Sequence, residues 1–310
     1  MDKFYSEIFQ FLQSSGLYIY KVREGHGYIS VKTELPNSSN PKALLLLGIQ
    51  AGSLKEAEKQ QAQAYEEITR LTDEFGNYPL IVSEDRWRRQ GNMTRSRLLA
   101  HLEIFTQIYA RNCEVRRIDK VTAQTFLEAN HSYGDAACKY RYGLYLKRHT
   151  GHNTRRHSEQ CEESLFPGTL VAVATFSNAR KWIKGEKTIR SYEWTRYASL
   201  PGIRLSGGMG RVLKAFIKDV QPDDIMTYAD LEWSEGKVYE VLGFVLEGIK
   251  EAVTFEVDYE YRRLQHRPHA LSTAYADTVT EEATQEEISG KRYLLNFGSN
   301  KYRMKLTDYQ

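Results

Sequence analysis

Gly202-Ile-Arg-Leu-Ser-Gly-Gly-Met-Gly-Arg211 holds four of the 21 glycines of this 310-residue chain. The residues before it, Arg190 to Tyr197, predict a strand, and the apolar residues after it, Val212 to Ile217, predict a helix. Glycines let backbone N–H groups approach an anion closely, and the N-terminus of a helix adds a partial positive charge at the same place. The pattern therefore predicts a phosphate site, although a glycine-rich turn also serves simply to join a strand to a helix.

The composition, with 41% hydrophobic and 27% charged residues, is typical of soluble globular proteins. A formal net charge of +3 is too small to indicate nucleic-acid binding by itself, and three irregularly spaced cysteines argue against a disulfide framework. The longest apolar run, Ala43 to Ile49, is much shorter than the ~20 residues of a membrane span. Since Met1 to Glu7 also lacks the apolar core of a secretion signal, we expect a cytoplasmic protein without a membrane partner. An organelle is the alternative if a transit peptide was removed.

Residues 1–112 predict a small α/β domain. A helix is expected near Phe4 to Leu12, and three extended segments are expected at 17–22, 27–32 and 43–50. A second helix begins after Ser53, a good N-cap with Glu56 at the capping-box position. A strand at Tyr78 to Ser83 follows, and then a helix at Thr94 to Phe105. A helix between two strands implies at least one parallel pair.

Five arginines crowd the junction after this strand: Arg86, Arg88, Arg89, Arg95 and Arg97. Trp87 stands among them, so the group suits a nucleic-acid backbone with one stacking surface, and Arg88 and Arg89 are candidate contacts. A solvated loop with salt bridges explains the same residues.

The residues Val82 to Trp87, the helix after them and Tyr109 to Cys113 resemble the end of small restriction-type nuclease domains. The resemblance implies two or three carboxylates and usually a lysine, which hold Mg²⁺ and position water. The central region offers only Glu24, Glu34 and Lys32. We therefore expect no metal site here and a nuclease-like domain retained for binding. An active nuclease is the least favoured alternative.

Residues 113–310 predict a second domain. A strand begins at Cys113, a helix spans Val121 to Asn130, and strands follow at Arg141 to Leu146 and Thr169 to Phe176. The insertion at 147–167 carries His149, His152, His157 and Cys161. Their spacing matches no standard zinc site, so a basic loop is expected instead. The acidic segment Thr278 to Glu287 is expected to be a linker.

With a fifth strand at Asp224 to Ala229, the order of elements is similar to the GCN5-related N-acetyltransferase (GNAT) superfamily. Tyr239-Glu-Val-Leu-Gly-Phe244 resembles the family's helix that carries a tyrosine into a sixth strand. Further segments resemble a phage and bacterial branch near the Mom-type DNA-modification proteins: Phe126 to His131, Gly143 to Tyr145, Tyr228 to Ser234 and Asn296 to Tyr302. The expected fold is thus α/β (α+β), with a GNAT-like mixed sheet flanked by helices and preceded by the smaller domain.

The resemblance implies that acetyl-CoA or another acyl-CoA binds at the glycine turn. The candidate cofactor residues are Arg204, Ser206, Gly207, Gly208, Met209, Gly210 and Arg211. Two registers of the family's loop are possible. Arg204 with Gly207 puts Met209 where a small residue belongs, whereas Gly208 with Gly210 puts Leu205 where a basic or amide side chain belongs. The resemblance also implies that the strand after Ala172 separates from the fourth strand and exposes N–H groups to the thioester carbonyl.

An amine that attacks a thioester needs a base for its proton and an acid for the departing thiolate. Glu193, just ahead of the turn, is the candidate base, unless it forms a salt bridge with Arg190 or Arg196. Tyr239 is the candidate acid, the alternative being a core tyrosine. His131 is a second candidate base, because its pKa suits proton transfer near neutrality, or else a structural residue at a helix end.

Asp230 and Trp233, after the fifth strand, are candidates to hold and stack an acceptor base, unless they only anchor a loop. The remaining candidate substrate residues are Asn130, Tyr228 and Ser234. Basic residues in this domain, Lys139, Arg141, Arg148, Arg155 and Arg156, favour a nucleic acid as partner. The expected function is N-acylation of a nucleic-acid amine. A non-catalytic nucleic-acid-binding protein, in which both folds have decayed, is the alternative.

Overall fold

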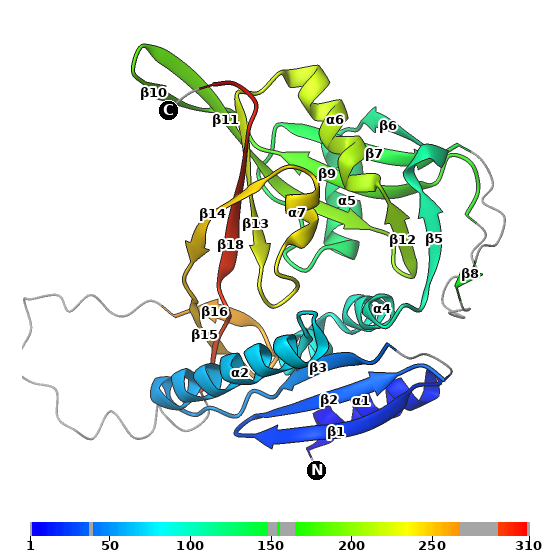
Figure 1. Ribbon diagram of the computed structural model, residues 1–310, viewed down its shortest axis with the longest axis vertical. Helices are drawn as coiled ribbons and strands as arrows, with labels where there is room; N and C mark the ends of the chain where they lie inside the picture. The colour runs from blue at the N-terminus through cyan, green and yellow to red at the C-terminus, as the bar shows by residue number, and fades with distance from the viewer. Residues whose placement is uncertain (1, 37–39, 148–153, 156–164, 267–290, 309–310) are drawn as a thin grey trace, which may run out of the picture. The chain divides into compact units, whose positions relative to one another are not determined.

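A computed structural model describes residues 2–36, 40–147, 154–155, 165–266 and 291–308. The chain forms two compact units, and their mixed helices and sheets confirm the α+β class (Figure 1). Unit 1 consists of Met1–Gly91, Asp230–Glu235 and Lys250–Ser299, and unit 2 of Asn92–Ala229, Gly236–Ile249 and Asn300–Gln310. This division differs from the expected boundary after residue 112, since residues 92–112 belong to unit 2 and two later segments belong to unit 1.

Unit 1 is built on a four-stranded sheet of order β1-β2-β3-β4. Its strands are β1 (Tyr18–Gly25), β2 (Tyr28–Glu34), β3 (Lys42–Leu47) and β4 (Leu80–Ser83). The first two pairs are antiparallel and β3 with β4 is parallel. Helix α1 (Lys3–Ser14) precedes the sheet, and α2 (Leu54–Phe75) makes the crossover that the parallel pair requires.

Helix α2 begins where its sequence predicts. The Ser53 hydroxyl accepts a hydrogen bond from the Glu56 N–H at 3.3 Å, and the Glu56 carboxylate accepts one from the Gly52 N–H at 2.8 Å. At its other end Gly76 takes the left-handed conformation, with φ of 67°, that a glycine adopts most readily. The buried face of the helix, with Ala64 and Ile68, packs on Leu45 and Leu47 of β3.

A second, three-stranded sheet completes unit 1. It has the order β16-β15-β17, formed by β15 (Thr254–Val257), β16 (Arg263–Gln265) and β17 (Arg292–Leu295), with both pairs antiparallel. Val257 and Leu294 share one buried cluster with Leu45 and Ile68 of the first sheet and α2. The expected linker at 278–287 lies outside the described residues. After β4 the chain forms α3 (Glu84–Arg89) in unit 1 and α4 (Gly91–His101), with which unit 2 begins.

Unit 2 contains an eight-stranded sheet of order β14-β18-β13-β11-β9-β7-β6, with β10 paired to β11 beside this path. The strands are β6 (Cys113–Arg117), β7 (Tyr140–Leu146), β9 (Leu170–Phe176), β10 (Arg180–Lys184), β11 (Lys187–Ser199), β13 (Asp224–Asp230), β14 (Val245–Lys250) and β18 (Ser299–Lys305). The helices are α5 (Lys120–Asn130), α6 (Gly208–Val220) and α7 (Lys237–Val241).

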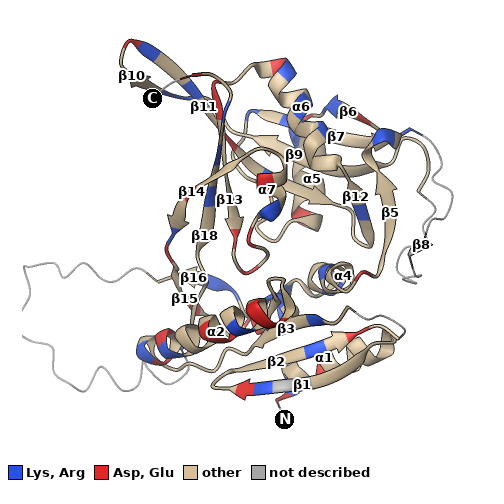
Figure 2. Ribbon diagram, viewed as in Figure 1, with Lys and Arg blue, Asp and Glu red and all other residues tan. Residues whose placement is uncertain are grey.

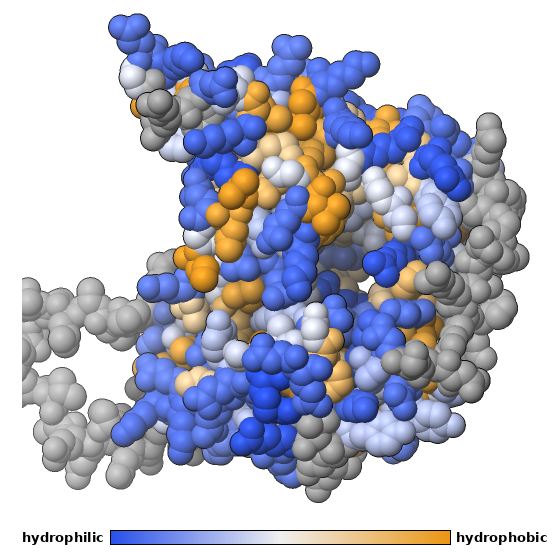
Figure 3. All heavy atoms as spheres, viewed as in Figure 1, coloured by the Kyte–Doolittle hydropathy of each residue, from blue (hydrophilic) through white to orange (hydrophobic). Residues whose placement is uncertain are grey.

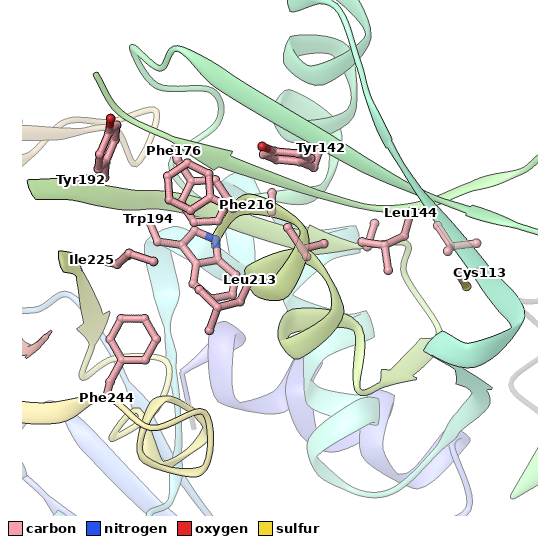
Figure 4. Packing of buried hydrophobic residues seen from close by; sticks show 14 of the residues in the cluster. Cys113, Tyr142, Leu144, Phe176, Tyr192, Trp194, Leu213, Phe216, Ile225 and Phe244 are labelled. Atoms are coloured by element: carbon pink, nitrogen blue, oxygen red, sulfur yellow. The ribbon is translucent and has the colours of Figure 1, made fainter. Parts of the chain in front are cut away.

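The two long helices cover opposite faces of this sheet. On the α6 side, the rings of Phe216 and Phe176 stack at 3.8 Å, and Trp194 joins the same cluster (Figure 4). On the α5 side, Phe126 packs against Val173 and Ala198. Successive side chains of a strand point to opposite faces, so β9 and β11 contribute to both layers of the core.

A small sheet of order β12-β5-β8 lies beside the glycine turn. Strand β12 (Ile203–Ser206) runs parallel to β5 (Phe105–Tyr109), and β8 (Thr154–Arg155) pairs with β5 on its other edge. A single 3₁₀ turn at Ala110–Asn112 leads from β5 into β6. The pairing with β12 explains why residues 92–112 belong to unit 2. The histidines and the cysteine of the insertion lie outside the described residues.

Candidate functional site

The candidate site of unit 2 is the place where β13 stops pairing with β11. The two strands are parallel neighbours over only three residue pairs, from Ser191 opposite Asp224 to Glu193 opposite Met226. Beyond these pairs the strands take different directions (Figure 1). The Thr227 hydroxyl donates a 3.1 Å hydrogen bond to the Trp194 carbonyl, and β11 is irregular between Trp194 and Arg196. A side chain thus replaces the ladder at the point of separation.

The separating strand differs from the one we expected. Strand β9 stays antiparallel to β11 from Ala172, opposite Ser199, to Phe176, opposite Trp194. The expectation that the strand after Ala172 separates is therefore wrong. The ladder with β11 uses the backbone groups of β9 on this side, with one irregularity, whereas β13 stops pairing with β11 after Met226.

Tyr239, on the short helix α7, lies beside this separation. Its ring packs edge-on against Trp194 at 6.0 Å and against Phe244 at 5.7 Å, and Tyr302 lies at 5.6 Å. Burial raises the pKa of Tyr239, and a hydrogen bond with Thr227 acts in the opposite direction. The phenol is therefore protonated at neutral pH and points toward the residue that bridges the two strands.

The glycine turn forms the N-terminus of α6. Gly207 precedes the helix with φ of 77°, which an L side chain rarely adopts, and its carbonyl accepts the first helical hydrogen bond, from Arg211. Within the described chain no side chain caps this terminus, and its first turn carries no acidic residue. The N–H groups of the first turn thus point out of the helix without a side-chain acceptor.

The two glycines at the start of α6, Gly208 and Gly210, differ in the space around them. A Cβ on Gly208 would lie 2.5 Å from the Tyr197 hydroxyl and 2.8 Å from Leu205, so only glycine lets α6 approach β11 and β12 here. At Gly210 a Cβ would meet only the flexible end of Leu242, at 3.2 Å. Gly208 is thus required by packing, and Gly210 has some room for a side chain.

The neighbours of the turn bear on its two possible registers. Leu205 packs into the core, while Arg204 is exposed, with its guanidinium 5.3 Å from the Phe105 ring. The Ser206 hydroxyl accepts a hydrogen bond from Gln107 of β5 at 3.0 Å, so this side chain supports the turn. Met209 is partly buried against the core, and Arg211 is exposed. Only the register with Arg204 has a basic side chain at the surface beside the turn.

The candidate base Glu193 is half-buried, and its backbone is fixed by Ser177 at 2.9 Å on both its N–H and its carbonyl. The expected salt-bridge partners are engaged elsewhere. Arg190 pairs with Asp223 at 3.2 Å, and Arg196 donates to backbone carbonyls, that of Gly134 among them. The Glu193 carboxylate therefore has no ion pair among the described side chains.

Two other candidates have structural roles in α5. The His131 Nδ1 accepts a 3.1 Å hydrogen bond from the Tyr133 N–H, which fixes the residue at the C-terminal end of the helix. The Asn130 amide donates to the Phe126 carbonyl one turn earlier, at 2.8 Å. These contacts favour the structural alternative for His131 over that of a base.

Asp230, the last residue of β13, and the residues after it belong to unit 1. Asp230 and Glu232 take part in an ion cluster, which consists of Asp85, Arg86, Asp230, Glu232 and Arg263. Arg86 contacts Glu232, with its Nε at 3.0 Å, and Asp230 at 3.3 Å, while Arg263 contacts Asp85 at 2.7 Å and Glu232 at 2.9 Å. Burial alone would raise the pKa of Glu232, but the charges of Arg263 and Arg86 outweigh it and lower this pKa. The cluster favours the loop-anchor alternative for Asp230.

The remaining substrate candidates are divided between the two units. The guanidinium of Arg86 lies 4.8 Å from the Trp233 ring, so in unit 1 one face of this indole is covered by an arginine. Ser234 is exposed. In unit 2, Tyr228 is 39% exposed on β13.

The arginine group of unit 1 does not form the expected surface. Trp87 is only 3% exposed and donates a 3.1 Å hydrogen bond to Glu7, so the interpretation of it as a stacking surface is wrong. Arg88 pairs with the same Glu7 carboxylate. Arg86 is buried in the ion cluster, and Arg89 remains exposed. Salt bridges and burial thus account for the charges of Arg86 and Arg88.

Two of the nuclease-type residues, Lys32 and Glu34, lie on β2 and contact Tyr20 of β1. Glu34 accepts a hydrogen bond from the Tyr20 hydroxyl at 3.4 Å, and the Lys32 ammonium lies 5.8 Å from the Tyr20 ring. Within the described ranges no three acidic, histidine or cysteine side chains come together as metal ligands would.

Sequence reasoning missed three features of unit 2. They are Thr227 between the separated strands, the support that β5 gives to the glycine turn, and the hairpin Arg180-Lys-Trp-Ile-Lys-Gly-Glu-Lys187. The hairpin had a readable signal, namely two short runs of strand type around Gly185-Glu186.

No helix within the described residues is both long and apolar enough to cross a membrane. No protein-family model matches the chain, and no curated protein matches it either.

Proposed function

We propose that the chain is an acyl-CoA-dependent N-acyltransferase whose site lies where β13 leaves β11. The observation that carries the proposal is the parallel pairing of these strands over only Ser191–Glu193 and Asp224–Met226. Strands that stop pairing leave backbone donors and acceptors to another molecule. The tyrosine and the glycine turn that the GNAT resemblance selects belong to elements that follow β13 and β11.

The order of the sheet supports this proposal independently of the local motifs. The resemblance rests on the succession of elements along the chain. In space, the fourth and fifth strands, β11 and β13, are neighbours, and the last strand, β18, lies between β13 and β14. Helix α6, after the glycine turn, covers the sheet at Phe176 and Trp194. Strands β11 and β13 and helix α6 therefore share one sheet and one core.

The first turn of α6 fits an anionic group such as a pyrophosphate. Its N–H groups have no side-chain cap, and Arg204 and Arg211 are exposed nearby in the sequence. An acyl-CoA would supply a thioester, which is an acyl group already activated toward an amine. The chain itself supplies the donors that hold the phosphates and the backbone that presents them.

Tyr239 and Glu193 are the groups that hold and move protons in this proposal. Burial keeps the proton on the Tyr239 phenol oxygen at neutral pH, so this atom is a donor for a departing thiolate. Glu193, next to the bridged Trp194 on β11, has a carboxylate without an ion pair among the described residues and accepts the proton of the attacking amine. The acceptor amine, in our proposal, belongs to a nucleic acid, which the Mom-type resemblance at Tyr228 to Ser234 supports.

Paired substitutions at Gly210 test the cofactor site. Gly210→Glu places a carboxylate in the first turn of α6, and Gly210→Gln places an isosteric neutral group there with the same contact to Leu242. We expect isothermal titration to show that wild type and Gly210→Gln bind acetyl-CoA, while Gly210→Glu binds about tenfold or more weakly, because two like charges at ~4 Å repel by ~1–4 kcal/mol. Equal affinities of the two variants would remove the turn from the site. No binding of acetyl-CoA or coenzyme A to wild type would favour the non-catalytic alternative.

A further inference from the structure

A two-stranded ribbon extends from the end of the large sheet of unit 2. Strand β10 pairs with β11 from Arg180, opposite Ser191, to Lys184, opposite Lys187. Neither β9 nor β13 forms a ladder with β11 between Lys187 and Arg190. The base of this part is still covered, since Ile189 is buried and the Arg190 backbone bonds to Asp223, so it is the outer part of the hairpin that projects beyond the sheet (Figure 1). Five residue pairs span about 17 Å. We call the residues Arg180–Ser191 the basic ribbon.

Positive charge dominates the basic ribbon (Figure 2). Its outer part contains Arg180, Lys181, Lys184 and Lys187 against the single acid Glu186. Lys187 donates to a backbone carbonyl, that of Asp308, at 3.1 Å. Among the described side chains, Arg180, Lys181 and Lys187 form no ion pair with a carboxylate. Their charge is thus left to a ligand or to solvent.

The cations lie on both faces of the basic ribbon. Side chains alternate along a strand and cross-strand partners share a face, so Arg180 and Lys187 lie on one face and Lys181 on the other. Ile183, on the face of Lys181, is 78% exposed. Figure 3 shows hydrophilic side chains around this projection. A flat anionic surface meets only one face of a ribbon, whereas a groove encloses both.

The base of the basic ribbon is firmly held. The hydroxyl of Ser191 donates to the Asp224 carboxylate of β13. Arg303 of β18 donates to the same carboxylate at 2.9 Å and to Glu247 of β14 at 2.7 Å, and its guanidinium lies 5.1 Å from the Trp182 ring. Ser191, Asp224 and Arg303 are all buried. A ribbon anchored by three strands presents its cations at little cost in conformational entropy.

We propose that the basic ribbon enters the major groove of double-stranded DNA and holds its phosphates. The major groove is about 12 Å wide and admits a two-stranded ribbon, with phosphates on both walls for cations on both faces. The exposed Ile183 is then placed against base edges, where apolar contacts with thymine methyl groups occur. This DNA would be the substrate of the proposed acyltransferase. Only its acylation rests on the proposed function; its binding by the basic ribbon does not.

The test compares two charge-matched double variants by fluorescence anisotropy of a labelled DNA duplex at several salt concentrations, without acyl-CoA. Lys181→Ala/Lys187→Ala removes one cation from each face of the basic ribbon, and Lys55→Ala/Lys59→Ala removes two exposed lysines of α2. For the ribbon variant we expect at least tenfold weaker binding and a slope of log K against log salt that is smaller by about 1.8, because each phosphate contact contributes ~0.9. The α2 variant should bind within about twofold of wild type, with an unchanged slope.

Equal losses in the two variants would overturn the proposal, since the effect would then follow net charge alone. Failure of wild type to bind the duplex at low salt would overturn it too. Anionic phospholipid vesicles provide the other arm: tighter binding to vesicles than to the duplex, lost in the ribbon variant, would assign the ribbon to a membrane surface instead. Since acyl-CoA is absent throughout, a protein that binds DNA through the ribbon but never binds acetyl-CoA would refute the proposed function and leave this inference standing.

Discussion

The ion cluster of unit 1 and the basic ribbon of unit 2 use the same kind of residue in opposite ways. In the cluster, Arg86 is buried, Arg263 is mostly buried, and the two face three carboxylates. In the ribbon, Arg180 and Lys181 are exposed and have no ion pair among the described residues. A buried charge must be paired because its desolvation costs several kcal/mol, whereas an exposed cation carries no such cost. Density of arginine in a sequence therefore says little about binding until the partners are known.

The largest effect should come from breaking the ion cluster. Glu232→Gln removes the charge that both Arg86 and Arg263 contact. Loss of one partner of a buried ion pair costs about 3–5 kcal/mol, so we expect the free energy of unfolding at pH 7, measured with urea, to fall by that amount. The matched control, Glu58→Gln on the exposed face of α2, should change it by less than about 0.5 kcal/mol.

The pH dependence of stability sharpens the same comparison. The folded protein lowers the pKa of Glu232 below that of the unfolded chain, about 4.3, so the stabilisation is complete above that pH. It is lost as the pH falls from there toward the lower folded value. Wild type and Glu232→Gln should thus differ most near neutrality and converge in acid. A difference that persists unchanged at low pH would contradict the role of this carboxylate.

The next effect concerns the tyrosine beside the separated strands. Under the proposed function, Tyr239→Phe should lower the rate of acyl transfer by about a hundredfold or more, because a positioned acid contributes ~10²–10⁴-fold. Its affinity for acetyl-CoA should stay as in wild type. Tyr142→Phe serves as the control, since it removes another hydroxyl of unit 2, bonded to Asp219 at 2.7 Å, and should leave the rate unchanged. A tyrosine with only a core role would show equal rates in both variants.

The smallest effect should come from the arginines of unit 1. Arg88→Ala removes the ion pair with Glu7 and should lower the free energy of unfolding by about 1 kcal/mol, while the salt dependence of DNA binding stays the same. Arg89→Ala, at an exposed residue, should leave stability within about 0.5 kcal/mol. A flatter salt slope in Arg88→Ala would show that unit 1 also contacts nucleic acid, and the contrast between the two regions would no longer hold.

Features that are determined by residues close together in the chain could be predicted from the sequence. The start of α2 follows from Ser53 and Glu56, three residues apart, and the turn before α6 follows from its own glycines. The α+β class follows from the alternation of such local patterns. The capping interactions and the positive φ of Gly207 need no knowledge of the rest of the chain.

The features that could not be predicted from the sequence depend on contacts with residues far away in the chain. Trp87 is buried by its contact with Glu7, 80 residues before it, which no local pattern of arginines reveals. Residues 92–112 belong to unit 2 because Thr106 pairs with Ile203 of β12. Thr227 gains its role only once β13 is placed beside β11. The site is therefore less predictable than the elements that carry it.

The division of the chain also determines how the protein can be taken apart. The backbone passes from one unit to the other after residues 91, 229, 235, 249 and 299. Neither unit is a contiguous piece of sequence, so no single proteolytic cut releases one, and no truncated gene encodes one. A fragment that ends at Gly91 would lack β15 and β17 and expose the apolar side chains that Val257 and Leu294 cover. Duplication or exchange of either unit as a module would thus require a rearranged coding sequence.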